Sequence, residues 1–169
     1  MTLLGVISDT HGLLRPEALD ALRGSELIIH AGDVGKPEIL KRLREIAPVV
    51  AVRGNVDTAP WAKELPETQV LRVAGRNIYV LHDRARLVVD PVTVGYAAVV
   101  FGHSHQALVE TRDGVLYAPP FPSPNHSRTA TRIDRVARTG DCPISLNLLP
   151  SAPSATRTPP AVPQGRARS

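Results

Sequence analysis

Four of the six histidines in this chain lie where a short apolar segment ends, and two carboxylates and an amide lie at similar positions. His103 and His105 follow one such segment with a single serine between them, and Asp9 and His11 are spaced in the same way after another. In an extended chain the side chains at positions i and i+2 point to the same side, so each pair can direct two ligands into one cleft. The candidate metal ligands are Asp9, His11, Asp33, Asn55, His82, His103 and His105.

These side chains offer hard oxygen and borderline nitrogen ligands and include no thiolate. That combination suits Mn²⁺, Fe, Zn²⁺ or Ni²⁺ better than Ca²⁺ or a structural zinc ion. Seven ligands are too many for one tetrahedral ion, and they suit two ions that share a bridging carboxylate. Two divalent ions would outweigh the charges of Asp9 and Asp33, so they would attract an anionic substrate and lower the pKa of a bound water.

The elements that must position these ligands are short aliphatic segments that alternate with helical patterns, as in an α/β or layered α+β domain. Because the C-terminal ends of parallel strands share one edge of a sheet, residues that follow such strands can meet there. Each candidate ligand lies at or just after the end of a segment of this kind. Strands are expected over residues 3–8, 26–31, 49–54, 77–82 and 97–102.

Two helices and a hairpin are expected between and after these strands. Pro16 and Pro37 each begin a helix, because proline is favoured in the first turn, and the second helix carries an apolar stripe. The pair Asp113-Gly114 predicts a hairpin turn. One or two further strands are expected within 129–149, whereas the proline-rich stretch 118–128 fits no regular strand.

Length and composition predict one domain over residues 1–150, because 169 residues with 43% hydrophobic content suffice for one compact core. Residues 151–169 carry three arginines and no acid, and this Pro/Ser/Arg-rich tail is expected to be disordered. The net charge of +4 therefore leaves +1 on the body, which argues against a stable nucleic-acid partner. The single cysteine and the lack of a long apolar stretch favour a cytoplasmic protein without a membrane segment.

The ordered series Asp-x-His, Gly-Asp, Gly-Asn, His and Gly-His-x-His resembles the signature of the calcineurin-like metallophosphoesterase superfamily. In detail, the segments VISDTHG, IIHAGDVG, VRGNVD, VLHD and VFGHSH resemble its small YfcE-like phosphodiesterase branch. The resemblance covers residues 1–117 well and is faint afterwards. It implies an α/β (layered α+β) fold in which two mixed β-sheets pack as a sandwich flanked by helices.

The resemblance also implies a mechanism and a set of roles. A hydroxide bridging two divalent ions, with Mn²⁺ as the first candidate, would attack the phosphorus of a small phosphodiester in line. Asp33, Asn55 and His103 would be the catalytic residues, with Asp33 bridging the ions. Relatives in this branch often form homodimers or homotetramers. The first ion would be held by Asp9, His11, Asp33 and His105, and the second by Asp33, Asn55, His82 and His103.

The chain departs from the family pattern at two places. Many members carry, directly after the metal-binding asparagine, a histidine that can protonate the leaving group, and here that position is Val56. Asp57 is either a substitute acid or an ordinary turn residue. Relatives also tend to have an Asn-Pro-Gly-Ser turn where this chain reads Ala118-Pro119-Pro120. A competing hypothesis is therefore a non-catalytic scaffold, as in the retromer subunit that resembles this fold.

Overall fold

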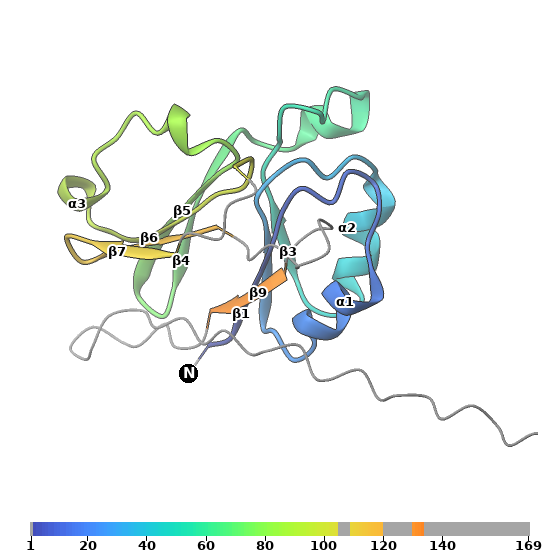
Figure 1. Cartoon of the computed structure of the whole chain (residues 1–169), viewed down its shortest axis with the longest axis horizontal. Helices are drawn as coiled ribbons and strands as arrows, with labels where there is room; N and C mark the ends of the chain where they lie inside the picture. The colour runs from blue at the N-terminus through green and yellow to red at the C-terminus, as the bar shows by residue number, and fades with distance from the viewer. Residues whose placement is uncertain (1, 105–108, 120–129, 134–169) are drawn as a thin grey trace, which may run out of the picture.

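Two β-sheets form the centre of the molecule in the computed structural model, which describes residues 2–104, 109–119 and 130–133 (Figure 1). The first sheet has the strand order β3 (Val49–Ala51), β2 (Leu27–His30), β1 (Leu4–Ile7) and β9 (Ala130–Ile133). The second has the order β4 (Thr68–Val73), β5 (Arg76–Leu81), β6 (Tyr96–Val100), β8 (Val115–Ala118) and β7 (Glu110–Arg112). Each sheet is mixed: β1, β2 and β3 run parallel, as do β5, β6 and β8, and antiparallel strands complete the sheets.

The two sheets pack face to face over an aliphatic core. Alternation along the strands sends Leu4 and Val6 of β1 to the same side, where they contact residues such as Val80 and Val100 of the second sheet. The opposite face of the first sheet, which includes Ile7 and Ile28, packs against the helices. These are α1 (Pro16–Leu22) and α2 (Pro37–Arg44), which lie together on one side of the molecule in Figure 1. The predicted sandwich of two mixed sheets flanked by helices is confirmed.

An aromatic-rich cluster covers the outer face of the second sheet. It includes Tyr79, Phe101 and Tyr117. The guanidinium of Arg84 lies 4.5 Å from the centre of the Tyr117 ring and forms an ion pair with Glu110 at 2.7 Å. Three short helical segments lie in the connections, and they are η1 (Pro60–Glu64), η2 (Arg84–Arg86) and α3 (Pro91–Val94).

The predicted strands and helices are present with shorter ends. The helices begin at Pro16 and Pro37, as expected, and they end at Leu22 and Arg44. The hairpin turns at Asp113-Gly114 as expected. The strand β4 was not predicted, and α3 was missed as well. Of the expected strands within 129–149, β9 is described, and the rest of that range and the tail 151–169 lie outside the described residues.

No helix in the described ranges 2–104, 109–119 and 130–133 is long and apolar enough to span a bilayer.

Candidate metal centre

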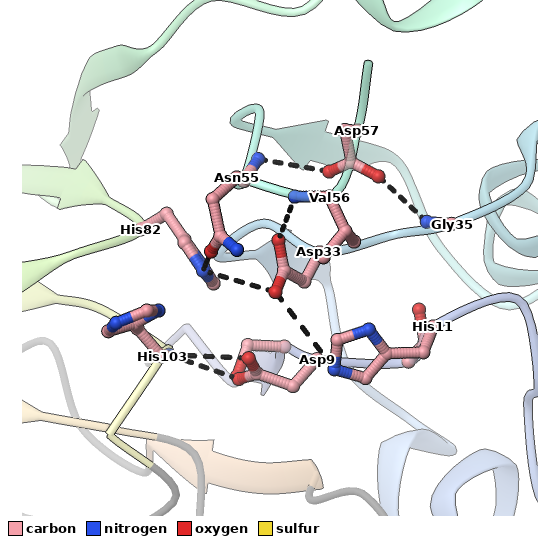
Figure 2. A network of polar contacts seen from close by, with 12 residues as sticks. Asp9, His11, Asp33, Gly35, Asn55, Val56, Asp57, His82 and His103 are labelled. Atoms are coloured by element: carbon pink, nitrogen blue, oxygen red, sulfur yellow. Dashed lines mark hydrogen bonds and ion pairs between the residues drawn. The ribbon is translucent and has the colours of Figure 1, made fainter. Parts of the chain in front are cut away.

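Five connecting loops meet where parallel strands of both sheets end. Asp9, Asp33 and Asn55 follow β1, β2 and β3 of the first sheet, while His82 and His103 follow β5 and β6 of the second. Their side chains face one another around a common space, with His11 beside them (Figure 2). Six of the seven candidate ligands are therefore neighbours in space, and the seventh, His105, lies outside the described residues.

The shortest distances in this group centre on Asp33. Its Oδ2 lies 3.4 Å from Nε2 of His82 and 3.9 Å from Nε2 of His11. Ligand atoms of Asp9, Asp33 and His82 all lie within 4.8 Å of one another, and the three residues are buried. The His103 ring meets the His82 ring edge to face, with the ring centres 5.2 Å apart. Asp33 thus has candidate ligands of other loops on either side of its carboxylate.

The hydrogen bonding of His82 tests whether a cation fits here. Its Nδ1 lies 2.8 Å from the carbonyl oxygen of Ala31, which can only accept, so Nδ1 donates and Nε2 of the neutral ring carries a lone pair. That lone pair faces Oδ1 of Asn55 at 2.9 Å and the carboxylate of Asp33. Three electron-rich atoms that face one another need a positive charge between them, either a proton on His82 or a metal ion. The donor set fits a divalent metal ion.

His82 and Asp33 both have pKa values that are shifted towards their charged forms. Burial alone would lower the pKa of His82, but its contacts with the Asp33 carboxylate and the Ala31 carbonyl raise that pKa overall. Burial likewise opposes ionisation of Asp33, but hydrogen bonds from His82 and from the Val56 N–H lower its pKa below the ordinary value. In the absence of metal, Asp33 is therefore ionised and His82 holds a proton more tightly than a free imidazole does.

The backbone at the centre adopts a conformation that side chains disfavour. Asp9, His11, Asp33 and His103 have φ of 53°, 46°, 55° and 68°, in the left-handed region. In the described part of the chain, the other two non-glycine residues with positive φ lie in hairpin turns. Each such residue costs about 1–3 kcal/mol, and this kind of strain is typical of functional sites. Backbone hydrogen bonds between the loops maintain this conformation. They include Asp9 N–H to the carbonyl oxygen of Gly32 and His11 N–H to the backbone carbonyl oxygen of Asp33, both at 2.9 Å.

Two glycines of the sequence series leave room for the ligands. A Cβ on Gly54 would lie 2.1 Å from Oδ1 of Asp33, and a Cβ on Gly102 would lie 2.8 Å from Oδ2 of Asp9. Both distances are far shorter than a van der Waals contact. These glycines are therefore present because the carboxylates occupy the positions that their side chains would take.

Ser8, Thr10 and His30 are buried next to the ligand group and form hydrogen bonds there. Ser8 donates a hydrogen bond from its hydroxyl to Asp9. His30 is fully buried with Nε2 3.0 Å from Thr10 Oγ1, and burial lowers its pKa to about 4, so it is neutral. His30 is thus a buried residue outside the group formed by Asp9, Asp33 and His82. The role of Ser8 was not predicted, and nothing in its sequence position distinguishes it from other strand-end serines.

The structure also decides between the two hypotheses for Asp57. This residue is 3% exposed and its carboxylate accepts backbone N–H groups of Val34, Gly35 and Gly54, at 2.8–3.0 Å. Figure 2 shows it on the far side of the Asp33 loop from the histidines. Asp57 is therefore a turn residue in this structure and does not face the space where a leaving group would lie.

The two sheets of the sandwich gather carboxylates and imidazoles at the ends of their strands, and this group could hold a metal ion. The family model of the calcineurin-like phosphoesterase superfamily domain matches residues 2–144, so the chain belongs to this superfamily. Membership, together with the buried Asp/Asp/His group, supports a metal-dependent phosphoesterase.

Known proteins similar to this chain include a metallophosphoesterase relative and two solved structures that share the fold. A probable metallophosphoesterase of Methanothermobacter thermautotrophicus is 37% identical over 134 residues, which cover 72% of this chain and 77% of the relative. A solved structure described as a novel archaeal phosphodiesterase has a TM-score of 0.65 and 22% identity, covering 79% of this chain and 93% of its own. Vps29 of Entamoeba histolytica, solved with Zn²⁺, has a TM-score of 0.62 and 22% identity, covering 80% and 87%.

Proposed function

We propose that this protein is a phosphodiesterase that binds two divalent metal ions, with Mn²⁺ as the first candidate, and hydrolyses a small phosphodiester. The observation that carries the proposal is the convergence of buried Asp9, Asp33 and His82 from both sheets, with their ligand atoms within 4.8 Å of one another. The similarity to an archaeal phosphodiesterase supports the choice of a diester substrate.

The proposed ligands divide into a buried floor and an exposed rim. Asp9, Asp33 and His82 are buried, whereas Asn55 and His103 are exposed and can meet a substrate. In this proposal Asp33 bridges the ions, and Asp33, Asn55 and His103 are the catalytic residues. One ion is assigned to Asp9, His11, Asp33 and His105, and the other to Asp33, Asn55, His82 and His103.

The residues of the chain have defined tasks in this proposal. Bound divalent ions would activate water and neutralise charge on the phosphoryl group. The Ala31 carbonyl holds His82 in the tautomer whose Nε2 is free to bind a cation. The Val56 N–H donates to Oδ1 of Asp33 at 3.0 Å and so fixes the orientation of the proposed bridging carboxylate.

The described residues that follow Asn55 offer the leaving group little help with protonation. Val56 occupies the position after Asn55, its side chain is 44% exposed, and an aliphatic group can donate no proton. Asp57 points its carboxylate at backbone amides. We therefore infer that the preferred substrates have leaving groups that are stable as anions, such as aryl or enol oxygens.

Hydrolysis of bis-p-nitrophenyl phosphate by purified protein with added Mn²⁺ tests the proposal. Asp33→Asn and His103→Ala are expected to remove the activity, since each takes away a proposed metal ligand. Asp90→Asn is a suitable control, because Asp90 is an exposed cap of α3 and lies outside the ligand group. Activity that persists in both ligand variants would contradict the assignment.

A second candidate function is a non-catalytic scaffold. The specific observations in its favour are the similarity in fold to Vps29 and the aliphatic side chain at position 56. The two candidates differ in what metal removal does. A scaffold keeps its partner binding after chelation, whereas the phosphodiesterase loses its function and regains it when Mn²⁺ is added.

A further inference from the structure

One buried carboxylate near the centre has no part in the proposed chemistry. Asp57 is 3% exposed, and it has no ion-pair partner among the residues described. A buried charge of this kind needs hydrogen bonds to replace the water that it has lost. Backbone groups supply them: Oδ2 accepts from Val34 N–H at 3.0 Å and from Gly54 N–H at 2.9 Å, and Oδ1 accepts from Gly35 N–H at 2.8 Å.

The donors belong to the two loops that carry proposed metal ligands. Val34 directly follows Asp33, and Gly54 directly precedes Asn55. A single oxygen atom, Oδ2, accepts from both loops, so it joins the neighbour of one ligand to the neighbour of the other. Figure 2 shows the Asp57 carboxylate between these two loops, behind the side chain of Asp33.

We propose that Asp57 is a positioning residue that fixes the separation of Asp33 and Asn55, and thereby sets the affinity of the centre for metal. This inference rests on the proposed function, because it requires that both residues bind metal. Metal–ligand distances in a well-formed site lie within about 0.2 Å of their standard values. The hydrogen bonds of Asp57 are made to Val34 and Gly54, which are the chain neighbours of Asp33 and Asn55. They therefore act directly on the distance between Asp33 and Asn55.

The same contacts provide a way to separate positioning from simple structural support. Support alone predicts that loss of the carboxylate lowers the melting temperature and leaves the metal affinity of the folded protein unchanged. Positioning predicts weaker metal binding at temperatures where the variant is fully folded. Loss of partners that orient metal ligands typically weakens binding about 10–100-fold.

Asp57→Asn and Asp57→Ala, with Asp90→Asn as the matched control, test the inference. Asp90 also accepts backbone N–H groups, from Val92 and Thr93, but at the start of α3. Mn²⁺ dissociation constants are measured by calorimetry well below each melting temperature. The expected result is a rise of about tenfold for Asp57→Asn, a larger one for Asp57→Ala and less than twofold for Asp90→Asn.

Three results would overturn the inference, and they are distinguishable. Wild-type protein that binds no Mn²⁺ removes the proposed function and the inference with it. If the wild type binds Mn²⁺ and a folded Asp57→Asn variant binds it equally well, the inference about Asp57 is wrong while the proposed function stands. Where the variants do not fold, hydrogen exchange on the wild type decides: the N–H groups of Val34, Gly35 and Gly54 must be protected without metal, and fast exchange there contradicts the proposal.

Discussion

Substitution of Gly54 by alanine is expected to damage the centre by steric displacement. The new Cβ would lie 2.1 Å from Oδ1 of Asp33 and 2.2 Å from its backbone nitrogen. Carbon needs about 3.5 Å for a van der Waals contact, so the two loops must separate by about 1.4 Å. Rotation of the Asp33 side chain cannot provide this space, because the backbone nitrogen is equally close. Gly54 is not in the left-handed region, so the effect arises from contact rather than from backbone strain.

The expected size follows from two limits. Overpacking of this kind costs about 1–3 kcal/mol of folding free energy. A displacement of about 1.4 Å is several times the roughly 0.2 Å that metal ligation tolerates, so the affinity for Mn²⁺ is expected to fall at least about tenfold. Denaturant unfolding of the metal-free protein measures the first effect, and calorimetric titration of the folded variant with Mn²⁺ measures the second.

Gly95→Ala is the matched control for this experiment. Gly95 has φ of 79° at the C-terminus of α3, and a Cβ there would meet no atom within 4 Å. Alanine at this position costs about 1–2 kcal/mol through backbone strain alone, and it should leave the Mn²⁺ affinity unchanged. Should Gly54→Ala bind Mn²⁺ as tightly as Gly95→Ala does, the close packing of Gly54 against Asp33 could not matter to the centre, and the reasoning would be wrong.

Four further predictions concern the proton on His82, the metal and the leaving group. Because the pKa of His82 is raised, Mn²⁺ must displace a proton from this residue when it binds. The affinity for Mn²⁺ should therefore fall by about tenfold for each pH unit below that pKa. Calorimetry across about pH 5.5–8 measures this slope. In metal-free protein the pH dependence has the opposite direction, because protonation of His82 stabilises the fold. This contribution to the free energy of unfolding is fully present below the ordinary pKa of 6.5, and it is lost as pH rises through the raised pKa. Urea unfolding with EDTA at several pH values measures it. Mn²⁺ at 100 times its dissociation constant should stabilise the wild type by about 2.7 kcal/mol for each ion bound but should not stabilise the Asp33→Asn variant. A thermal shift shared by both would place the ions elsewhere. Val56→His is expected to increase the hydrolysis rate with alkyl diesters more than with p-nitrophenyl diesters, because only an alkyl leaving group needs a proton. An equal change in rate for both substrates would contradict the role assigned to position 56.

The strands that carry the ligands could be predicted because each is a short aliphatic run followed by a polar residue. The hairpin at Asp113-Gly114 was predictable for the same kind of local reason, since this pair favours the turn. The strand β4 was missed because its apolar and polar residues do not alternate: Val70 is exposed whereas Gln69 is half-buried. In addition, Ala74-Gly75, which joins β4 to β5, is not a typical turn pair. Ala74 nevertheless takes φ of 50° there, so pairing with β5 outweighs its local preference.

The types of the candidate ligands were visible in the sequence, but the atoms that orient them were not. The Ala31 carbonyl that fixes the His82 ring is 51 residues away in the chain, and it is a backbone group that no side-chain pattern reveals. The hydrogen bonds of Asp57 to Val34 and Gly35 likewise span more than 20 residues. From sequence alone, a turn residue is the commoner explanation for Asp57, and the acid hypothesis stays open beside it. Long-range backbone contacts therefore account for what the sequence could not predict at the centre.

Anomalous diffraction from a crystal grown with Mn²⁺ tests the central claim most directly. The account predicts two peaks about 3.5–4 Å apart, on either side of the Asp33 carboxylate. One peak should lie beside Asp9 and the other beside His82 and Asn55. A map with no peak within coordinating distance of Asp33 would contradict it.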